Sequence, residues 1–344
     1  MREGWEYKKF ENCIVKSPKL KQVKKEAYNN GSQYPIISQE EKFISGYCDD
    51  ESMVCHIDRP IVVFGDHTRV LKYIDFDFVV GADGVKVIIP IKSIDSKFLL
   101  YFLQWYNIPN LGYSRHYKLL KDVMVPIPNC TTQQTIISEL DKLNKLIQIK
   151  KEQLKDYDAL AQSIFYEMFG DPVVNEKGWE VKKFGDLFKL KSGDGLSSKD
   201  FKTGIYPVYG GNGISGYHNS FNMKGCYIII GRVGVYCGNV RKVEGEFWLT
   251  DNAFRLIYKE NEQNPFFILY LLNILDLHQY ANAAAQPVIS NLTLKSINVP
   301  LPPLSLQQSF AHKIEQIEQQ KAAIQKTITD LETLLAARMQ YWFD

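Results

Sequence analysis

Two pairs of short polar segments carry the side chains in this sequence that are best suited to binding chemistry. They are residues 64–69 and 112–118 in the first half of the chain, and 231–234 and 286–291 in the second half. Arginine can donate two hydrogen bonds to guanine, glutamine or asparagine can pair in the same way with adenine, and lysine or serine can hold phosphates. Solvated loops and hydrogen bonds inside the fold use the same residue types, so those interpretations stay open. The DNA contacts that we predict are His67, Arg69, Ser114, Arg115, His116, Lys118, Arg232, Gln286, Ser290 and Asn291.

These segments carry no recognisable motif of catalysis or cofactor binding. Asp66 and His67 could form a general-base pair, but segment 231–234 has arginine and valine in their place. Turn-forming residues follow the Gly-x-Gly-x-x-Gly pattern at 211–216, so we interpret it as a turn and not as a pyrophosphate loop. The histidines and cysteines lack metal-binding spacing, and Cys48 and His218, which occupy matching positions in the two halves, have no further ligands beside them. We predict a non-enzyme with no metal or cofactor of its own.

Length and composition limit the classes of protein that the chain can belong to. With 344 residues and a hydrophobic share of 45%, it can form two or three packed domains. Lysine and arginine number 41 and aspartate and glutamate 39, a net charge of +2, so binding to nucleic acid must depend on local patches. Six cysteines without a Cys-x-x-Cys pair and the lack of a long apolar run favour a soluble cytoplasmic protein with reduced thiols.

The sequence contains an internal repeat that relates its two halves. Residues 4–10 return as 178–184, and 121–128 return as 295–302, both at an offset of 174. Between these ends the offset falls to 172 at Tyr34 and Tyr206 and to 169 at Tyr101 and Tyr270. Matching ends around unlike interiors favour one scaffold with two different variable surfaces, although an old, decayed duplication would also leave this pattern.

Each copy should contain a compact α/β (α+β) domain followed by one long helix. Apolar runs at 61–64 and 227–230 predict strands, and residues 98–106 and 266–275 predict one shorter helix in each copy. The long helix should begin at a hydroxyl cap, Thr131 or Thr132 in the first copy and Ser305 in the second. Glycine, aspartate and proline at 170–172 should end the first long helix.

Both long helices have a heptad pattern that predicts pairing. Lys150, Lys321 and Arg338 interrupt the apolar positions, which are otherwise filled by large side chains. Because the first helix leads from domain one to domain two and the second leads back, we expect an antiparallel coiled coil with a domain at each end. The expected domains are residues 1–130 and 171–303, and the expected helices are 131–170 and 304–344. The pairing residues that we predict are Leu140, Ile147, Leu154, Ala161, Ile314, Ile324, Ile328 and Leu335.

The order of these features resembles the DNA specificity subunit of type I restriction-modification systems. The second copy carries the Tyr-Pro-x-x-x-Gly-x-Gly-Ile-Ser-Gly-Tyr element at 206–217, Phe-Trp-x-Thr-Asp-Asn-Ala at 247–253 and the Pro-x-Pro-Pro-Leu-x-x-Gln-Gln element at 300–308. The first copy departs from this pattern at 78–84 and at Asn129-Cys130, and is similar to another branch of the family. The resemblance covers nearly the whole chain.

This resemblance implies two target-recognition domains, each reading one half of a split double-stranded DNA site. It implies helices that set the spacer and dock methyltransferase subunits, of which we expect two. Those partners would bind S-adenosylmethionine and methylate a flipped adenine, and an ATP- and Mg-dependent restriction subunit could join them. A smaller stand-alone methylation system, a self-sufficient methyltransferase and a protein scaffold that does not bind DNA are the alternatives. The sequence does not specify the target bases.

Overall fold

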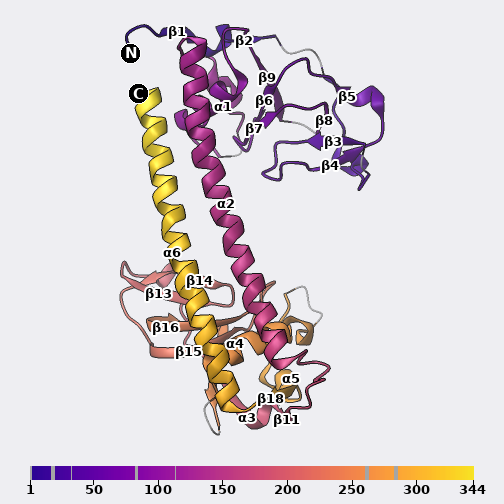
Figure 1. Ribbon diagram of the computed structural model, residues 1–344, viewed down its shortest axis with the longest axis vertical. Helices are drawn as coiled ribbons and strands as arrows, with labels where there is room; N and C mark the ends of the chain where they lie inside the picture. The colour runs from indigo at the N-terminus through magenta and orange to yellow at the C-terminus, as the bar shows by residue number, and fades with distance from the viewer. Residues whose placement is uncertain are drawn as a thin grey trace. The chain divides into compact units, whose positions relative to one another are not determined.

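The computed structural model describes residues 2–16, 20–31, 33–81, 84–112, 114–259, 263–282 and 286–344. The chain divides into two compact units, which are shown in Figure 1. Unit 1 comprises Met1–Lys151 and Lys326–Asp344, and unit 2 comprises Glu152–Gln325. Each unit therefore contains one copy of the α/β domain together with a part of both long helices.

Unit 1 contains two four-stranded sheets and a two-stranded pair of β1 and β10. The strand orders are β2-β9-β6-β7 and β4-β3-β8-β5, and β3 runs parallel to β8. Helix α1 (Ser96–Tyr106) packs on β7 and β6. The strands are β1 (Glu6–Lys9), β2 (Ile14–Val15), β3 (Tyr34–Ile37), β4 (Gly46–Cys48), β5 (Val54–Cys55), β6 (Ile61–Gly65), β7 (Leu71–Ile74), β8 (Phe78–Val80), β9 (Val85–Pro90) and β10 (Met124–Ile127).

Unit 2 repeats this plan with one continuous six-stranded sheet in the order β12-β17-β15-β16-β13-β14. The long strand β16 takes the place of both β7 and β8, and β13 pairs with it in parallel as β3 pairs with β8. The strands are β11 (Glu180–Lys183), β12 (Phe188–Ser192), β13 (Tyr206–Gly210), β14 (Gly213–His218), β15 (Met223–Gly231), β16 (Val240–Leu249), β17 (Ala253–Tyr258) and β18 (Asn298–Leu301); the shorter helices are α3 (Phe184–Leu187), α4 (Pro265–Ile274) and α5 (Asn291–Lys295).

The repeated sequence forms the same frame in both units. Strand β1 pairs antiparallel with β10, and β11 pairs with β18 in the same register, from Glu6 opposite Ile127 and from Glu180 opposite Leu301. Directly after these strands, Phe10 and Phe184 are buried, and their backbone N–H groups donate to carbonyl oxygens at 2.8 Å in both units. The frame thus closes each domain next to the start of a long helix.

The long helices are α2 (Cys130–Phe169) and α6 (Leu304–Phe343), each of 40 residues. The cap of α2 differs from the prediction, since the Asn129 side chain accepts from the Thr132 N–H at 2.8 Å and both threonines lie within the first turn. Likewise Ser305 lies inside α6, which begins one residue earlier. The predicted stop is confirmed: α2 ends before Gly170, which has the left-handed φ of 76°.

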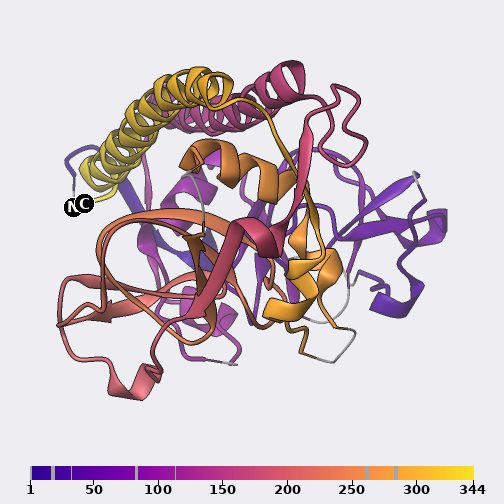
Figure 2. The ribbon, with the colours of Figure 1, turned by 90° about the horizontal axis from the view of Figure 1, so that it is seen from below.

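The two long helices are antiparallel. In unit 1 the beginning of α2 contacts the end of α6, and in unit 2 the end of α2 contacts the beginning of α6; Figure 2 shows the two helices side by side. Six of the predicted pairing residues are buried, and Leu154 and Leu335 are half-buried. The predicted α/β fold with paired antiparallel helices is therefore confirmed.

Charged residues that interrupt the heptads form ion pairs between the helices. Lys321 contacts Asp158 of α2 at 2.7 Å, and Arg338 binds Glu139 through two nitrogens. Burial lowers the pKa of Lys321, but its hydrogen bonds to carboxylates outweigh that effect and raise the pKa overall. The hydrogen bond from Arg338 lowers the pKa of Glu139. Partly exposed pairs contribute about 0–1 kcal/mol each, so they define the pairing register more than they stabilise it.

Each long helix ends against the shorter helix of one domain, α4 for the end of α2 and α1 for the end of α6. Phe169 at the end of α2 packs against Phe267 of α4, with ring centroids 4.9 Å apart. Phe343 at the end of α6 packs against Phe98 of α1, with centroids 5.6 Å apart. Phe169 and Phe343 are 174 residues apart, and Phe98 and Phe267 are 169 residues apart. Both spacings are offsets of the sequence repeat. The pseudo-symmetry therefore extends into the cores.

A buried glutamine fastens the start of each long helix to its domain. Gln133 donates to the carbonyls of Ser93 at 2.8 Å and Pro128 at 2.9 Å, and its Oε1 accepts from the N–H of Asp95, the N-cap of α1. Gln307 makes the matching bonds to Pro302 and to the N–H of Asn264, the N-cap of α4. The paired glutamines seen in the sequence are thus structural.

We expect Gln133→Ala to lower the free energy of unfolding by about 2–3 kcal/mol, because it leaves buried backbone groups without partners. The neighbouring Gln134 is exposed, so Gln134→Ala should change stability by less than about 1 kcal/mol and is the matched control. Urea unfolding followed by circular dichroism measures both. Equal effects of the two substitutions would show that the buried amide does not fasten the helix.

Among the residues that the structure describes, no helix is both long enough and apolar enough to span a membrane.

Candidate nucleic-acid interface

The two polar segments of the first copy lie together in unit 1. The N–H of His116 donates to the main-chain oxygen of Asp66 at 2.8 Å, and the N–H of Tyr117 donates to the Asp66 carboxylate at 2.8 Å. The Arg69 guanidinium donates to the Ile108 carbonyl at 2.8 Å. The loop after β6 and the loop after α1 therefore form one continuous surface.

Parts of this surface face inward. His116 is fully buried, accepts from the Leu111 N–H at 3.0 Å and lies 2.9 Å from the Asp66 carbonyl through Nδ1. The structure thus places His116 in the interior, where it holds the two loops together and cannot reach a base. Asp66 is 2% exposed and lies 3.9 Å from the ammonium of Lys86, which is the environment of a structural carboxylate.

Other residues of the first copy point into solvent. Arg115 and Lys118 are exposed, whereas His67, Arg69 and Ser114 are half-buried. The backbone N–H of Ser114 donates to the Gly112 carbonyl at 2.8 Å. Tyr113 lies outside the described residues. Of the predicted contacts in this copy, Arg115 and Lys118 are the best placed for a ligand in solvent.

The two polar segments of the second copy also lie together. Val233 and Val288 form an antiparallel bridge, the Gly234 N–H donates to Pro287 at 2.9 Å and the Ile289 N–H donates to Arg232 at 2.9 Å. This contact matches that between Asp66 and His116 in the first copy. Each joins the loop after β6 or β15 to the segment between α1 and β10 or between α4 and β18. The repeated frame thus builds one composite loop surface in each unit.

The side chains on the second surface differ from those on the first. Arg232 is half-buried, with its guanidinium 5.4 Å from the centroid of the Phe254 ring, and its buried Nε has no hydrogen-bond partner among the described residues. Gln286 is exposed. Ser290 is exposed and caps α5 by accepting from the Thr293 N–H, with the half-buried Asn291 as the first helical residue. The two units therefore share the backbone arrangement of these loops but carry different side chains on them.

The glycine pattern at 211–216 forms a β-hairpin. Strands β13 and β14 are joined by the two-residue turn of Gly211 and Asn212, which confirms the turn interpretation. An added Cβ at Gly231 would lie 2.4 Å from the Gly211 carbonyl oxygen, so this hairpin packs closely on the Arg232 loop. The hairpin turn therefore belongs to the same loop cluster.

The family comparison matches both halves of the chain. A family model described as "Type I restriction modification DNA specificity domain" matches residues 2–156 and again residues 176–333. The chain belongs to this family. The two matches correspond to the two copies of the repeat, so this chain carries the specificity domain twice.

Individual relatives share the family's fold and parts of its sequence. The chain is 27% identical over 202 residues to the type I restriction enzyme EcoprrI specificity subunit of Escherichia coli, a match covering 56% of this chain and 50% of that protein. It is 30% identical over 141 residues to the MjaIX specificity subunit of Methanocaldococcus jannaschii, covering 34% and 33%. The matches thus span half or less of these curated relatives. The crystal structure of an S subunit from M. genitalium matches at a TM-score of 0.60 and 17% identity, covering 99% of this chain and 96% of that one, which shows a common fold.

Sequence reasoning missed one basic residue of the second specificity domain. Arg241 on β16 is exposed and donates to the Asn212 carbonyl of the hairpin turn at 3.3 Å. In the sequence, the one sign of this residue was a basic side chain at the second position of a strand. Within the described ranges, no group of three or more histidine, cysteine, aspartate or glutamate residues could hold a metal ion. His218 is buried, and its Nδ1 accepts from the Lys202 N–H at 3.0 Å.

Proposed function

We propose that this chain is the DNA specificity subunit of a type I restriction-modification complex. Each specificity domain reads one half of a bipartite double-stranded site through its composite loop surface. The observation that carries the proposal is the doubled frame: equivalent hydrogen bonds join the same two loops in both units, while the side chains on those loops differ. A shared scaffold with different reading residues is what two unlike half-sites require.

The exposed or half-buried polar residues of the two loop surfaces are the proposed DNA contacts. In the first half-site they are Arg115, for base edges, and Lys118, for phosphate. In the second half-site Gln286 and Asn291 contact bases, with Ser290 and Arg232 beside them. His67, Arg69 and Ser114 support the first surface from partly buried positions. A net charge of +2 gives weak non-specific binding, so partner subunits must supply much of the affinity for the DNA backbone.

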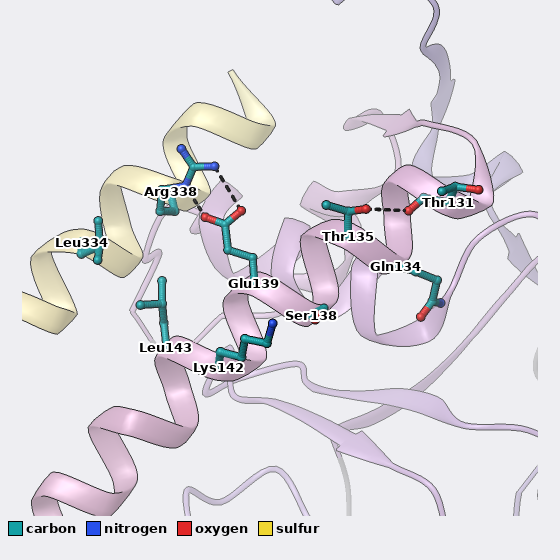
Figure 3. A pocket seen from close by; sticks show the side chains of 9 residues that line it. All are labelled: Thr131, Gln134, Thr135, Ser138, Glu139, Lys142, Leu143, Leu334 and Arg338. Carbon is teal, nitrogen blue, oxygen red and sulfur yellow. Dashed lines mark hydrogen bonds and ion pairs between the residues drawn. The ribbon is translucent and has the colours of Figure 1, made fainter.

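The long helices form the second interface of the proposed subunit. In unit 1, α2 and α6 border a groove of about 710 Å³, which includes Glu139, Leu143, Leu334 and Arg338 (Figure 3). We propose that methyltransferase subunits dock along the helices, and that the helices set the spacer between the half-sites. Each helix is unbroken over 40 residues, about 60 Å at 1.5 Å per residue, which suits a rigid spacer.

Catalysis in this proposal belongs to the partners. The methyltransferase subunits supply the S-adenosylmethionine site, and a restriction subunit, where present, uses ATP and Mg. The complex acts on cytoplasmic DNA. A specificity subunit of a stand-alone methylation system would have the same surfaces and would differ only in lacking the restriction partner.

We expect Arg115→Ala to relax preference at one base pair by about 1–3 kcal/mol while changing overall affinity less, because a bidentate base contact is lost. Lys118→Ala, its matched exposed neighbour, should weaken binding to all sequences alike and reduce the salt dependence, because a phosphate contact is lost. Binding of the assembled complex to single-base variants at two salt concentrations separates the two. If wild-type complex shows no preference between target and shuffled DNA, the proposed function is wrong.

A further inference from the structure

The loop after the central strand is longer in unit 2 than in unit 1. Eight residues separate β15 from β16, whereas five separate β6 from β7. In unit 1 the shorter loop is tied back to the domain, since the Thr68 hydroxyl donates to the Gln39 carbonyl at 2.5 Å and Arg69 donates to Ile108. The longer loop projects two apolar side chains instead, Val235 and Tyr236.

Hydrogen bonds and close packing hold the base of the longer loop. The Gly231 N–H donates to Asn239 at 2.9 Å, the Gly238 N–H donates to Gly231 at 2.8 Å, and the Cys237 N–H donates to Gly234 at 2.9 Å. Cys237 is 1% exposed, and a Cβ at Gly238 would lie 2.5 Å from the His278 nitrogen. Because Cys237 and Gly238 are held against the domain, the residues before them are directed outward.

The tip of this loop is apolar and accessible. Val235 is 79% exposed and Tyr236 is 51% exposed. The fixed base means that little conformational entropy remains to be lost when the tip meets a ligand. An adjacent valine and tyrosine, held in solvent by a rigid turn, are suited to an apolar contact with a binding partner.

The loop is continuous with the proposed DNA surface. The Gly234 N–H, directly before the tip, donates to Pro287, the residue after Gln286. Arg232 lies two residues before Gly234 in the same loop, with its half-buried guanidinium over the Phe254 ring. In the major groove, the apolar group available to such a tip is the 5-methyl group of thymine, and groove edges there also offer acceptors to arginine and glutamine.

We propose that Val235 and Tyr236 contact the 5-methyl group of a thymine in the half-site that residues 171–303 read. This inference rests on the proposed function and adds an apolar contact to it. The first half-site lacks the equivalent contact from its shorter loop, so the two domains differ in how they recognise A·T pairs.

The test uses the assembled complex and a duplex that carries its target, identified by sequencing methylated motifs in the host. Each thymine of the second half-site is replaced in turn by deoxyuracil, which removes the methyl group alone. At one position we expect wild-type binding to weaken about fourfold, the effect of one buried methyl group. Val235→Ala and Tyr236→Ala should reduce this difference to less than about twofold.

Val173→Ala is the matched control, because Val173 is also a valine of unit 2 and is 72% exposed. This variant should keep the fourfold difference. The inference is overturned if wild-type binding responds to no thymine methyl in that half-site, if the half-site contains no A·T pair, or if both tip variants keep the full difference. Loss of methyltransferase binding by the tip variants, with the thymine response intact, would assign the tip to a protein partner. Wild-type binding without preference for the target would instead refute the proposed function itself.

Discussion

Replacing residues 171–303 with the corresponding span of another family member is expected to change one half of the recognised DNA site and leave the other half unchanged. The span contains both strands of the β11–β18 pair, the full six-stranded sheet and both loops of the second surface. Bonds within unit 2 join the two loops of the second surface, and bonds within unit 1 join the two loops of the first. Each altered base pair should shift preference by about 1–3 kcal/mol.

The donor for this replacement must fit the packing at the end of α2 and the beginning of α6. Phe165, Phe169 and Phe310 of these helices pack on Phe267 and Tyr270 of the replaced span. A relative with aromatic residues at both positions keeps that contact, and a chimera that re-inserts the original span is the control. Methylated-motif sequencing gives the result. A change in both halves of the motif together would contradict independent reading by two domains.

The sequence predicted well the elements that depend on a local residue pattern or on the internal repeat. Heptad spacing identified both long helices, and Gly170 ends α2 where a left-handed residue was expected. The repeat identified the loop pairs, because the same two segments stood out in both copies. The helix caps were less predictable. Asn129, Thr131 and Thr132 are all residue types that can cap a helix, and in the structure the Asn129 side chain is the one that accepts from the Thr132 N–H.

Exposure of individual loop residues could not be predicted, because it depends on contacts far apart in the sequence. His116 and Arg115 are adjacent and both suited to DNA, yet His116 is buried by its bonds to Asp66, fifty residues away. Lys321 and Arg338 interrupt the heptads when one helix is considered alone. Their partners Asp158 and Glu139 lie on the other helix, so only the paired structure explains them.

Two leucines at equivalent positions mark the docking faces that we propose for the methyltransferase subunits. Leu334 of α6 in unit 1 is 46% exposed, and Leu160 of α2 in unit 2 is 47% exposed, and they are 174 residues apart. Contiguous exposed apolar surface is typical of contacts with another protein, and Leu334 lines the groove together with Leu143. The groove of unit 1 contains Leu334, and the repeat predicts a second, equivalent face around Leu160.

We expect Leu334→Asp and Leu160→Asp each to remove one of two bound methyltransferase subunits, and the double variant to remove both and abolish methylation. A buried carboxylate at a protein interface costs several kcal/mol, whereas at a solvent-exposed helix position the same change costs about 0.5 kcal/mol in helix propensity. The free chain should therefore keep its fold while assembly fails.

Val181→Asp, at a residue 46% exposed on β11, is the matched control and should leave assembly intact. Mass photometry of the reconstituted complex counts the subunits. Two methyltransferases bound to the double variant would show that partners dock elsewhere, whereas a loss of both from either single variant would show that the two subunits depend on each other to bind.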